Sequence, residues 1–235
     1  MGLDVLAPSG NELIKTVIFD FDGTLVSSLE GIHACFREAL SGFGYSEPSL
    51  AAVRQTVGLT LEESVRRLAN GQCSDALVDG VVTFYRDLYA EKGRAMATLF
   101  TGAIDTLCAV RGMGIRIVVV SNKSFAGVLR LAEQLGIEGP IDLMLGAVNV
   151  PFRKPEARLY TETIAPHLMD TDGRSVLMVG DSESDILFAR NAGLRSCWVS
   201  YGYGDAAACR ALDPEFILPG ITQLPGLICT LNSAE

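Results

Sequence analysis

The sequence lacks the long apolar runs that would place the protein in or across a membrane. No apolar stretch approaches the length of a membrane span. The first twenty residues contain no basic start followed by an apolar segment, so no signal peptide is expected. We therefore predict a soluble protein of the cytoplasm.

Histidine is scarce, and cysteine never occurs at metal-binding spacing. The sequence has only 2 histidines, and its 6 cysteines are scattered with no Cys-x-x-Cys pair. This pattern favours reduced, mostly buried thiols and argues against a structural zinc site. His33 lies in a predicted helix downstream of Asp20, and a role for it near the active site is left open.

Positive charge is also in short supply. Lys and Arg number 19 against 28 Asp and Glu, which gives a net charge of −9. Nucleic acid or an anionic membrane is therefore an unfavourable general partner. An anionic substrate would need a local positive site, supplied by Lys, Arg or a metal ion.

The 235 residues, 49% of them hydrophobic, are enough for a substantial core. Apolar runs typical of buried strands alternate with segments of helical spacing, which predicts a parallel sheet covered by helices on both faces. The fold class expected is therefore α/β, with a doubly wound, Rossmann-like core. The predicted strands are 17–19, 115–121, 141–147, 175–180, 195–200 and 216–218, and the predicted helices are 102–111, 124–135, 155–168 and 184–192.

Residues 28–98 interrupt this alternation. They contain no convincing strand and four amphipathic helical stretches, at 28–41, 49–57, 60–69 and 75–92. We predict a small all-α cap domain at 27–99, inserted after the first strand of a core formed by 1–26 and 100–235. Gly102 and residues 26–28 are the expected hinges.

The strongest motif is at the end of the first strand, in Val17-Ile18-Phe19-Asp20-Phe21-Asp22-Gly23-Thr24-Leu25. A buried strand that ends in Asp-x-Asp-Gly must satisfy two negative charges at its exit. A divalent cation or hydrogen-bond donors can do this. The alternative is a turn merely capped by aspartates, since Asp-Gly is common in turns.

Three further motifs follow predicted strands: Ser121-Asn122-Lys123, Lys154-Pro155 and Gly180-Asp181-Ser182-Glu183-Ser184-Asp185. Ser121 and Asn122 can donate to the oxygens of an anion, and Lys154 offers a point charge suited to phosphate. Because carboxyl ends of parallel strands share one edge, four carboxylates could converge there. They would repel one another without a hard cation such as Mg²⁺.

In this order and on these strand ends, the four motifs resemble those of the haloacid dehalogenase-like hydrolase superfamily. The resemblance spans residues 15 to about 202, and the helical block resembles that superfamily's inserted cap. Within the superfamily the chain is most similar to the phosphoglycolate phosphatases. That finer similarity rests on Arg54-x-x-Val57-Gly58-Leu59 and Ser200-Tyr201-Gly202-Tyr203-Gly204.

The resemblance implies a role for each motif residue. Asp20 would be the nucleophile that forms an aspartyl-phosphate, and Asp22 the general acid and base. Mg²⁺ would be held by Asp20, the backbone carbonyl of Asp22 and Asp181, supported by Asp185. Ser121 and Lys154 would act in catalysis, whereas Gly23, Thr24, Asn122 and Arg54 would contact the substrate. Arg54 would pair with the carboxylate of a small phosphorylated acid such as phosphoglycolate. The alternative for Arg54 is a solvated position on a helix face.

Other activities are compatible with the same motifs. Asp22 favours phosphoryl transfer over dehalogenation, because a leaving halide needs no acid. A phosphatase of sugar phosphates, nucleotides or pyrophosphate, or a phosphomutase of the β-phosphoglucomutase kind, would keep both aspartates. A phosphonate hydrolase would need a Schiff-base lysine in the cap, where Lys92 is the only one. A non-catalytic binding protein would be expected to have lost one of the motif residues. The expected partner is a small phosphorylated metabolite, and the sequence leaves the oligomeric state undetermined.

Overall fold

A computed structural model describes residues 13–71, 73–147, 150–168 and 172–233. Its centre is a six-stranded sheet in which every pairing is parallel and the order is β5-β4-β1-β6-β7-β8. The strands are β1 (Thr16–Phe19), β4 (Arg116–Ser124), β5 (Leu143–Ala147), β6 (Val176–Gly180), β7 (Arg195–Val199) and β8 (Phe216–Leu218). Each of the six corresponds to a predicted strand.

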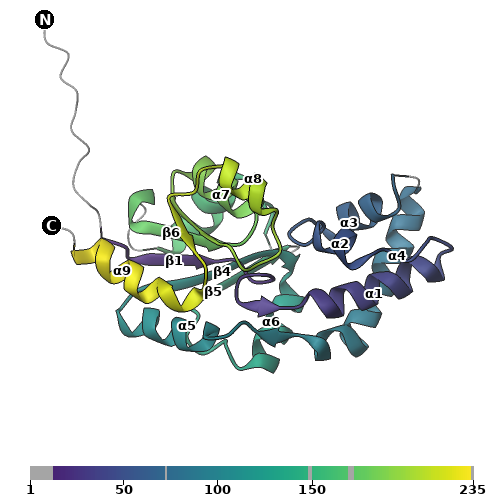
Figure 1. The fold of residues 1–235 in the computed structure, drawn as a ribbon, viewed down its shortest axis with the longest axis horizontal. Helices are drawn as coiled ribbons and strands as arrows, with labels where there is room; N and C mark the ends of the chain where they lie inside the picture. The colour runs from purple at the N-terminus through teal and green to yellow at the C-terminus, as the bar shows by residue number, and fades with distance from the viewer. Residues whose placement is uncertain (1–12, 72, 148–149, 169–171, 234–235) are drawn as a thin grey trace, which may run out of the picture.

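Helices cover both faces of this sheet (Figure 1). Successive strand residues point to opposite faces, so Val17 and Phe19 belong to one apolar cluster and Ile18 to another. The first cluster includes residues of α5 (Ala103–Gly112), α6 (Phe125–Leu135) and α9 (Leu224–Ser233). The second includes residues of α7 (Glu183–Ala192) and of a π-helical segment, Leu159–Ile164. The doubly wound core is therefore confirmed.

The inserted segment folds as helices around an apolar cluster of its own. These helices are α1 (Leu29–Gly42), α2 (Leu50–Arg54), α3 (Leu61–Leu68) and α4 (Asp75–Leu88), followed by a π-helical turn, Tyr89–Gly93, and a 3₁₀ turn, Arg94–Met96. Ser49, Thr60 and Ser74 cap α2, α3 and α4, each accepting a hydrogen bond from a first-turn amide. The fold class, including the helical cap, is as predicted. The exact domain boundaries remain a prediction, and residues 1–12 lie outside the described part.

The chain enters and leaves the cap through two short strands that the sequence did not reveal. β2 (Val26–Ser27) pairs antiparallel with β3 (Thr98–Leu99), so the two crossings lie side by side. Gly102 follows with a φ of 78°, as the residue that caps α5. A two-residue strand carries too little pattern to be recognised in a sequence.

Several helices differ from their predicted extents. The predicted helix 155–168 is a turn at Arg153–Glu156, then the π-helical segment and a 3₁₀ turn, Ala165–His167. Pro155 and Pro166 lack the N–H groups that a continuous α-helix would use. The predicted helix 49–57 ends at Arg54, and α8 (Ala206–Ala211) and α9 were not predicted.

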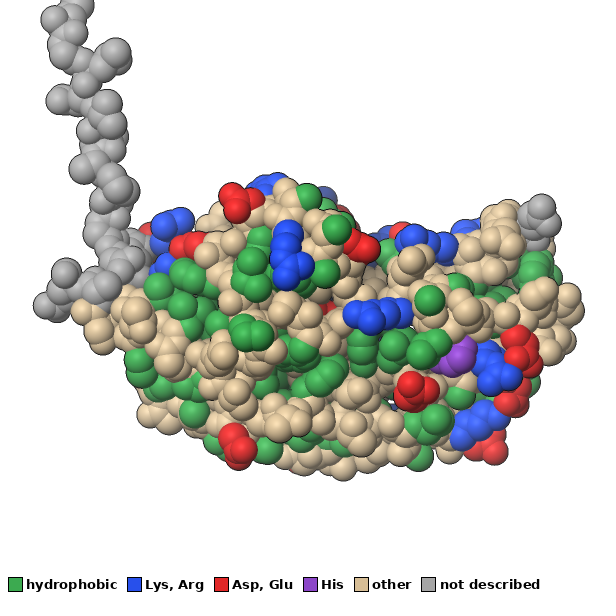
Figure 2. Space-filling model, in the orientation of Figure 1, with side chains coloured by type: hydrophobic (Ala, Val, Ile, Leu, Met, Phe, Trp, Pro, Cys, Tyr) green, Lys and Arg blue, Asp and Glu red, His purple; other side chains and the backbone are tan. Residues whose placement is uncertain are grey.

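The outer surface is mixed in charge. On the face shown in Figure 2, acidic and basic side chains are interspersed, and the outline is hollowed between the core and the cap helices. Among the described residues, no helix combines the length and apolarity that crossing a membrane requires.

Candidate active site

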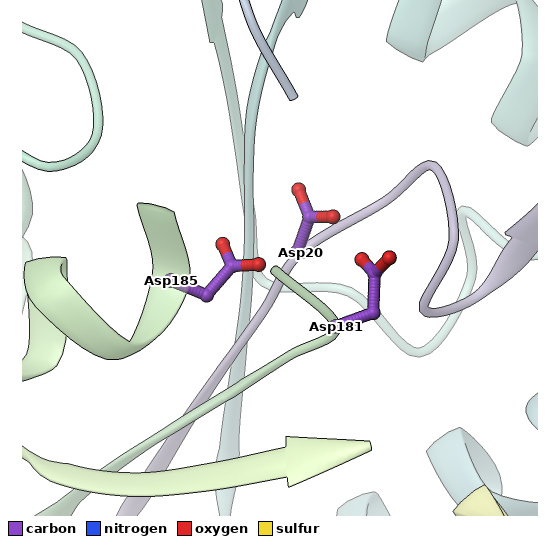
Figure 3. A group of neighbouring side chains, drawn as sticks. All are labelled: Asp20, Asp181 and Asp185. Atoms are coloured by element: carbon purple, nitrogen blue, oxygen red, sulfur yellow. The ribbon is translucent and has the colours of Figure 1, made fainter. Parts of the chain in front are cut away.

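Three carboxylates meet at the carboxyl edge of the sheet (Figure 3). Asp20 follows β1, Asp181 follows the neighbouring strand β6, and Asp185 lies in the first turn of α7. Each offers an oxygen within 4.8 Å of the others, and all three residues are buried. The sequence-predicted convergence thus holds for these three residues.

Lys154 is the positive group closest to this cluster. Its Nζ donates to Oδ1 of Asp20 and to Oδ1 of Asp185, each at 2.6 Å, and its side chain is 3% exposed. Burial alone would lower the pKa of Lys154, but Asp185 and Asp20 outweigh it and hold that pKa above its ordinary value. The Lys154 side chain therefore stays protonated and positively charged.

One ammonium does not balance three carboxylates. Burial raises the pKa of Asp20 well above its ordinary value, opposed by Lys154 and reinforced by Asp185 and Asp181. A buried excess of negative charge is unfavourable unless a cation compensates it. The donors are all oxygens, the set that Mg²⁺ prefers, so the residues present fit a hard divalent ion.

Asp181 is held by a loop that follows β7. The Tyr203 amide donates to its Oδ2 at 2.6 Å, and the Thr24 hydroxyl donates to its Oδ1 at 3.2 Å. Burial, and then the Asp185 charge, raise the pKa of Asp181 to about 6. The close approach depends on glycine, because a Cβ on Gly23 or Gly202 would lie 2.4 or 2.2 Å from Asp181 atoms.

The Asp22 side chain does not join the three-carboxylate cluster. Its Oδ1 accepts from the Ser28 hydroxyl at 2.5 Å, and Lys123 Nζ lies 3.2 and 3.3 Å from its two oxygens. Asp22 nevertheless lines the same cavity as Asp20, so three of the four carboxylates form the cluster and the fourth lies beside it with donors of its own. Its predicted role in metal binding, through the backbone carbonyl, is a separate matter and stays a prediction.

Lys123 is a site residue to which the sequence reasoning gave no role. Burial would lower its pKa, but Asp22 and Tyr89 outweigh this effect and raise it. Its ammonium also donates to the Tyr89 hydroxyl at 3.0 Å and lies 4.3 Å from that ring's centroid. A lysine directly after Ser121-Asn122 was the available signal.

Asn122 joins the catalytic edge to the cap. Its side-chain amide donates to the Lys154 carbonyl at 3.1 Å and to the Gly58 carbonyl at 2.8 Å. Its Oδ1 accepts from the Lys154 amide at 3.2 Å. The Ser121 hydroxyl is nearby and accepts from the Lys123 amide at 3.1 Å.

Two cap residues singled out in the sequence lie elsewhere. The Arg54 guanidinium donates to the carbonyls of Tyr203 at 3.0 Å and Gly202 at 2.7 Å. His33 Nε2 lies 3.1 Å from the Pro48 carbonyl. Neither residue lines the cavity beside Asp20 and Asp22. The proposed contact of Arg54 with a substrate carboxylate thus stays a prediction.

Tyr203 is the other site residue that the sequence reasoning did not identify. Besides its amide contact with Asp181, its phenol oxygen accepts from the amides of Ser28 at 2.8 Å and Leu29 at 3.2 Å. Tyr203 therefore contacts Asp181, the start of α1 and, through its carbonyl, Arg54. The glycine-flanked motif Ser200–Gly204 was the signal for this loop.

Comparison with known proteins agrees with this architecture. The sequence pattern of the haloacid dehalogenase-like hydrolases matches residues 17–199. The chain is 30% identical to a Dickeya dadantii protein named "Probable phosphatase IndB", over 89% of this chain and 91% of that protein. It is also 30% identical to a Pseudomonas putida phosphoglycolate phosphatase, over 96% and 83%. A crystal structure of a predicted phosphoglycolate phosphatase from Haemophilus somnus superposes with a TM-score of 0.85, at 24% identity, covering 93% and 99%.

The chain belongs to the haloacid dehalogenase-like hydrolase family. Within that family it is an enzyme of the phosphatase type.

Proposed function

We propose that the protein is a Mg²⁺-dependent phosphatase that hydrolyses a phosphate monoester through a covalent intermediate on Asp20. The observation that carries this proposal is the buried cluster of Asp20, Asp181 and Asp185, joined to Lys154, with Asp22 two residues beyond the nucleophile. A buried carboxylate at a strand end, beside a fixed cation, suits attack on a phosphoryl group.

Two displacements account for hydrolysis. In the first, an Asp20 oxygen bonds to phosphorus as the bond from phosphorus to the alcohol oxygen breaks, and Asp22 gives that oxygen its proton. In the second, Asp22 takes a proton from water, whose oxygen bonds to phosphorus and releases Asp20 and inorganic phosphate. Ser28 and Lys123 hold the Asp22 side chain in place for both transfers.

The metal ion would be bound by Asp20 and Asp181, with the Asp22 backbone carbonyl, and Asp185 would support it. When bound, Mg²⁺ offsets the charge of the phosphoryl oxygens. Lys154 keeps Asp20 and Asp185 in position. In this proposal the Ser121 hydroxyl and the backbone amide of Asn122 donate to the transferring oxygens.

The substrate we propose is phosphoglycolate or a similar small phosphorylated acid, as the name of the Pseudomonas putida relative suggests. Sugar phosphates, nucleotides and pyrophosphate are the alternatives within the same chemistry. The six cysteines are all free, which fits the cytoplasmic location that we propose with this function. Lys92, the cap lysine, pairs with Glu38, an arrangement that gives a phosphonate hydrolase no support.

The test is hydrolysis of p-nitrophenyl phosphate and of a panel of phosphate monoesters, with and without Mg²⁺. We expect metal-dependent release of phosphate from p-nitrophenyl phosphate, with phosphoglycolate among the preferred natural esters. Absence of turnover on every ester of the panel, with Mg²⁺ present and the protein folded, would contradict the proposal.

A further inference from the structure

A cavity of about 480 Å³ extends from the catalytic edge beneath the cap. Asp20, Asp22 and Ser121 line one end of it. Other walls come from α1 and α4 of the cap and from the first half of α6, with Phe36, Tyr85 and Arg130 among the lining residues. The alcohol part of a phosphate ester held at Asp20 would extend into this cavity.

Unpaired arginines gather around this cavity. Most arginine side chains in the described part of the chain make an ion pair or a hydrogen bond, for example Arg37 with Glu47. Those with neither to another described residue are Arg94, Arg130, Arg153 and Arg174. All but Arg174 line the cavity. Hydrogen bonds from Thr60 lower the pKa of Glu63 and the charge of Arg153 lowers it further, but Arg153 forms no ion pair with Glu63. In a chain of net charge −9, guanidinium groups without an ion-pair partner that line one cavity favour a negatively charged ligand.

Two of these arginines lie on the same side of the cavity. The Gln134 side chain donates to the Arg94 carbonyl at 3.2 Å, which fixes the 3₁₀ turn Arg94–Met96 against α6. Arg130 stands one helical turn before Gln134, on the same face of α6. Both side chains line the cavity, and a guanidinium binds carboxylate or phosphate through paired N–H groups.

Tyr85 supplies an independent indication of a ligand. The residue is 8% exposed, and its ring packs on Phe36 and Tyr89 with centroid distances of 4.5 and 5.9 Å. Its hydroxyl has no hydrogen-bond partner among the described residues, whereas the Tyr89 hydroxyl accepts from Lys123. Because Tyr85 lines the cavity, a polar group of a ligand there could accept a hydrogen bond from this hydroxyl.

We propose that the part of the cavity lined by Arg94, Arg130 and Tyr85 binds a second anionic group on the substrate. Arg94 and Arg130 pair with that group. Tyr85 donates a hydrogen bond to the part of the substrate that lies between the second anionic group and the phosphoryl group. The inference rests on the proposed function and refines it. The preferred substrate is a phosphate monoester whose alcohol carries a carboxylate or a second phosphate, rather than a neutral alcohol.

The test uses phosphate esters of straight-chain alcohols that end in a carboxylate, a second phosphate or a neutral amide, across several chain lengths. With the full-length protein and Mg²⁺, kcat/KM should be highest for an anionic ester, at the chain length that spans the cavity. The carboxylate and bisphosphate arms identify which anion the site accepts. The neutral amides and p-nitrophenyl phosphate report the chemistry without the second anion.

Arg94→Ala and Arg130→Ala should each lower kcat/KM for the anionic esters by roughly 10- to 100-fold, as expected for losing a charged hydrogen bond. They should change p-nitrophenyl phosphate turnover by less than about twofold. Tyr85→Phe should lower kcat/KM for the anionic esters less than either arginine variant. Arg174→Ala is the matched control, because the Arg174 side chain also has no partner among the described residues but does not line the cavity.

Two outcomes would overturn the inference while leaving the proposed function in place. One is a wild-type enzyme that turns over p-nitrophenyl phosphate but shows no preference for anionic over neutral esters. The other is equal loss on both kinds of ester in Arg94→Ala and Arg130→Ala. Failure of the wild-type enzyme to hydrolyse any ester would instead remove the proposed function, and this inference with it.

Discussion

The catalytic edge of the core and the cap side of the cavity differ in whether their polar side chains have partners. At the core edge the charged groups are paired: Lys154 with Asp20 and Asp185, and Lys123 with Asp22. On the cap side, Arg94 and Tyr85 lack polar partners among the described residues. The edge is thus built for one kind of chemistry before a substrate arrives. The cap side retains hydrogen-bond donors that a substrate would satisfy, so it is suited to determining which substrate binds.

The largest effect should come from removing the nucleophile. Asp20→Asn keeps the size of the side chain but replaces the carboxylate that attacks phosphorus. We expect turnover to fall by roughly 10³-fold or more on every ester, with little change in the circular dichroism spectrum. Retention of more than a few per cent of wild-type turnover would show that the covalent route is wrong.

Removing Lys154 should damage both activity and stability. Lys154→Met leaves Asp20 and Asp185 buried without their common cation, so we expect about a 100-fold loss of kcat. Without metal, unfolding in urea should be easier by about 3–5 kcal/mol, the cost of breaking a buried ion pair. Lys92→Met is the control, since Lys92 forms an exposed pair with Glu38. Equal stability of the two variants would contradict the central place of Lys154.

The stability of the metal-free protein should depend on pH. Because the pKa of Asp181 is raised to about 6 from an ordinary value of 3.8, the metal-free folded state holds a proton that the unfolded chain releases. The free energy of unfolding without metal should therefore fall as pH rises through this window, and level off above about 6.

Mg²⁺ should reverse that loss, so its effect on Tm should grow as pH rises from 5 to 7.5, because its ligands must be ionised. Excess EDTA should remove activity. Ca²⁺ should inhibit, since its looser geometry allows both Asp20 oxygens to bind. Full turnover in EDTA after dialysis, or a Tm that Mg²⁺ leaves unchanged at pH 7.5, would exclude the proposed metal site.

The smallest effect should come from Arg54, a cap residue that contacts the core loop after β7. Its contacts with the carbonyls of Gly202 and Tyr203 predict that Arg54→Ala lowers kcat/KM by about tenfold or less, equally for phosphoglycolate and p-nitrophenyl phosphate. Arg67→Ala is the control, as Arg67 makes one long contact within the cap. A loss near 10²-fold confined to phosphoglycolate would instead support the carboxylate contact predicted from the sequence.

The core could be predicted from the sequence because its signals are local. A strand buried on both faces reads as an apolar run, and Asp20, Asp181 and Lys154 each follow such a run or its loop. Position in the chain then determines position at the sheet edge. The resemblance to a known family added roles that no spacing rule supplies.

The cap side could not be predicted in the same way. The lack of a partner for Arg130, or for the Tyr85 hydroxyl, depends on packing between segments far apart in the chain. The contact of Asp22 with Lys123 likewise joins residues that are distant in sequence. The π-helical turn at Tyr89–Gly93 also differs from the regular helix expected over 75–92. Loops and irregular helices follow from tertiary contacts that local patterns do not contain.

Phosphorylation of Asp20 during turnover is the step on which the proposed function depends most. The enzyme would be mixed with a phosphate ester and Mg²⁺, quenched in acid within the first turnover, and its peptides examined by mass spectrometry. We expect a phosphoryl group on the Asp20 peptide, labile to hydroxylamine and absent from Asp20→Asn. A phosphoryl group on another residue, or none while phosphate is released in a burst, would contradict it.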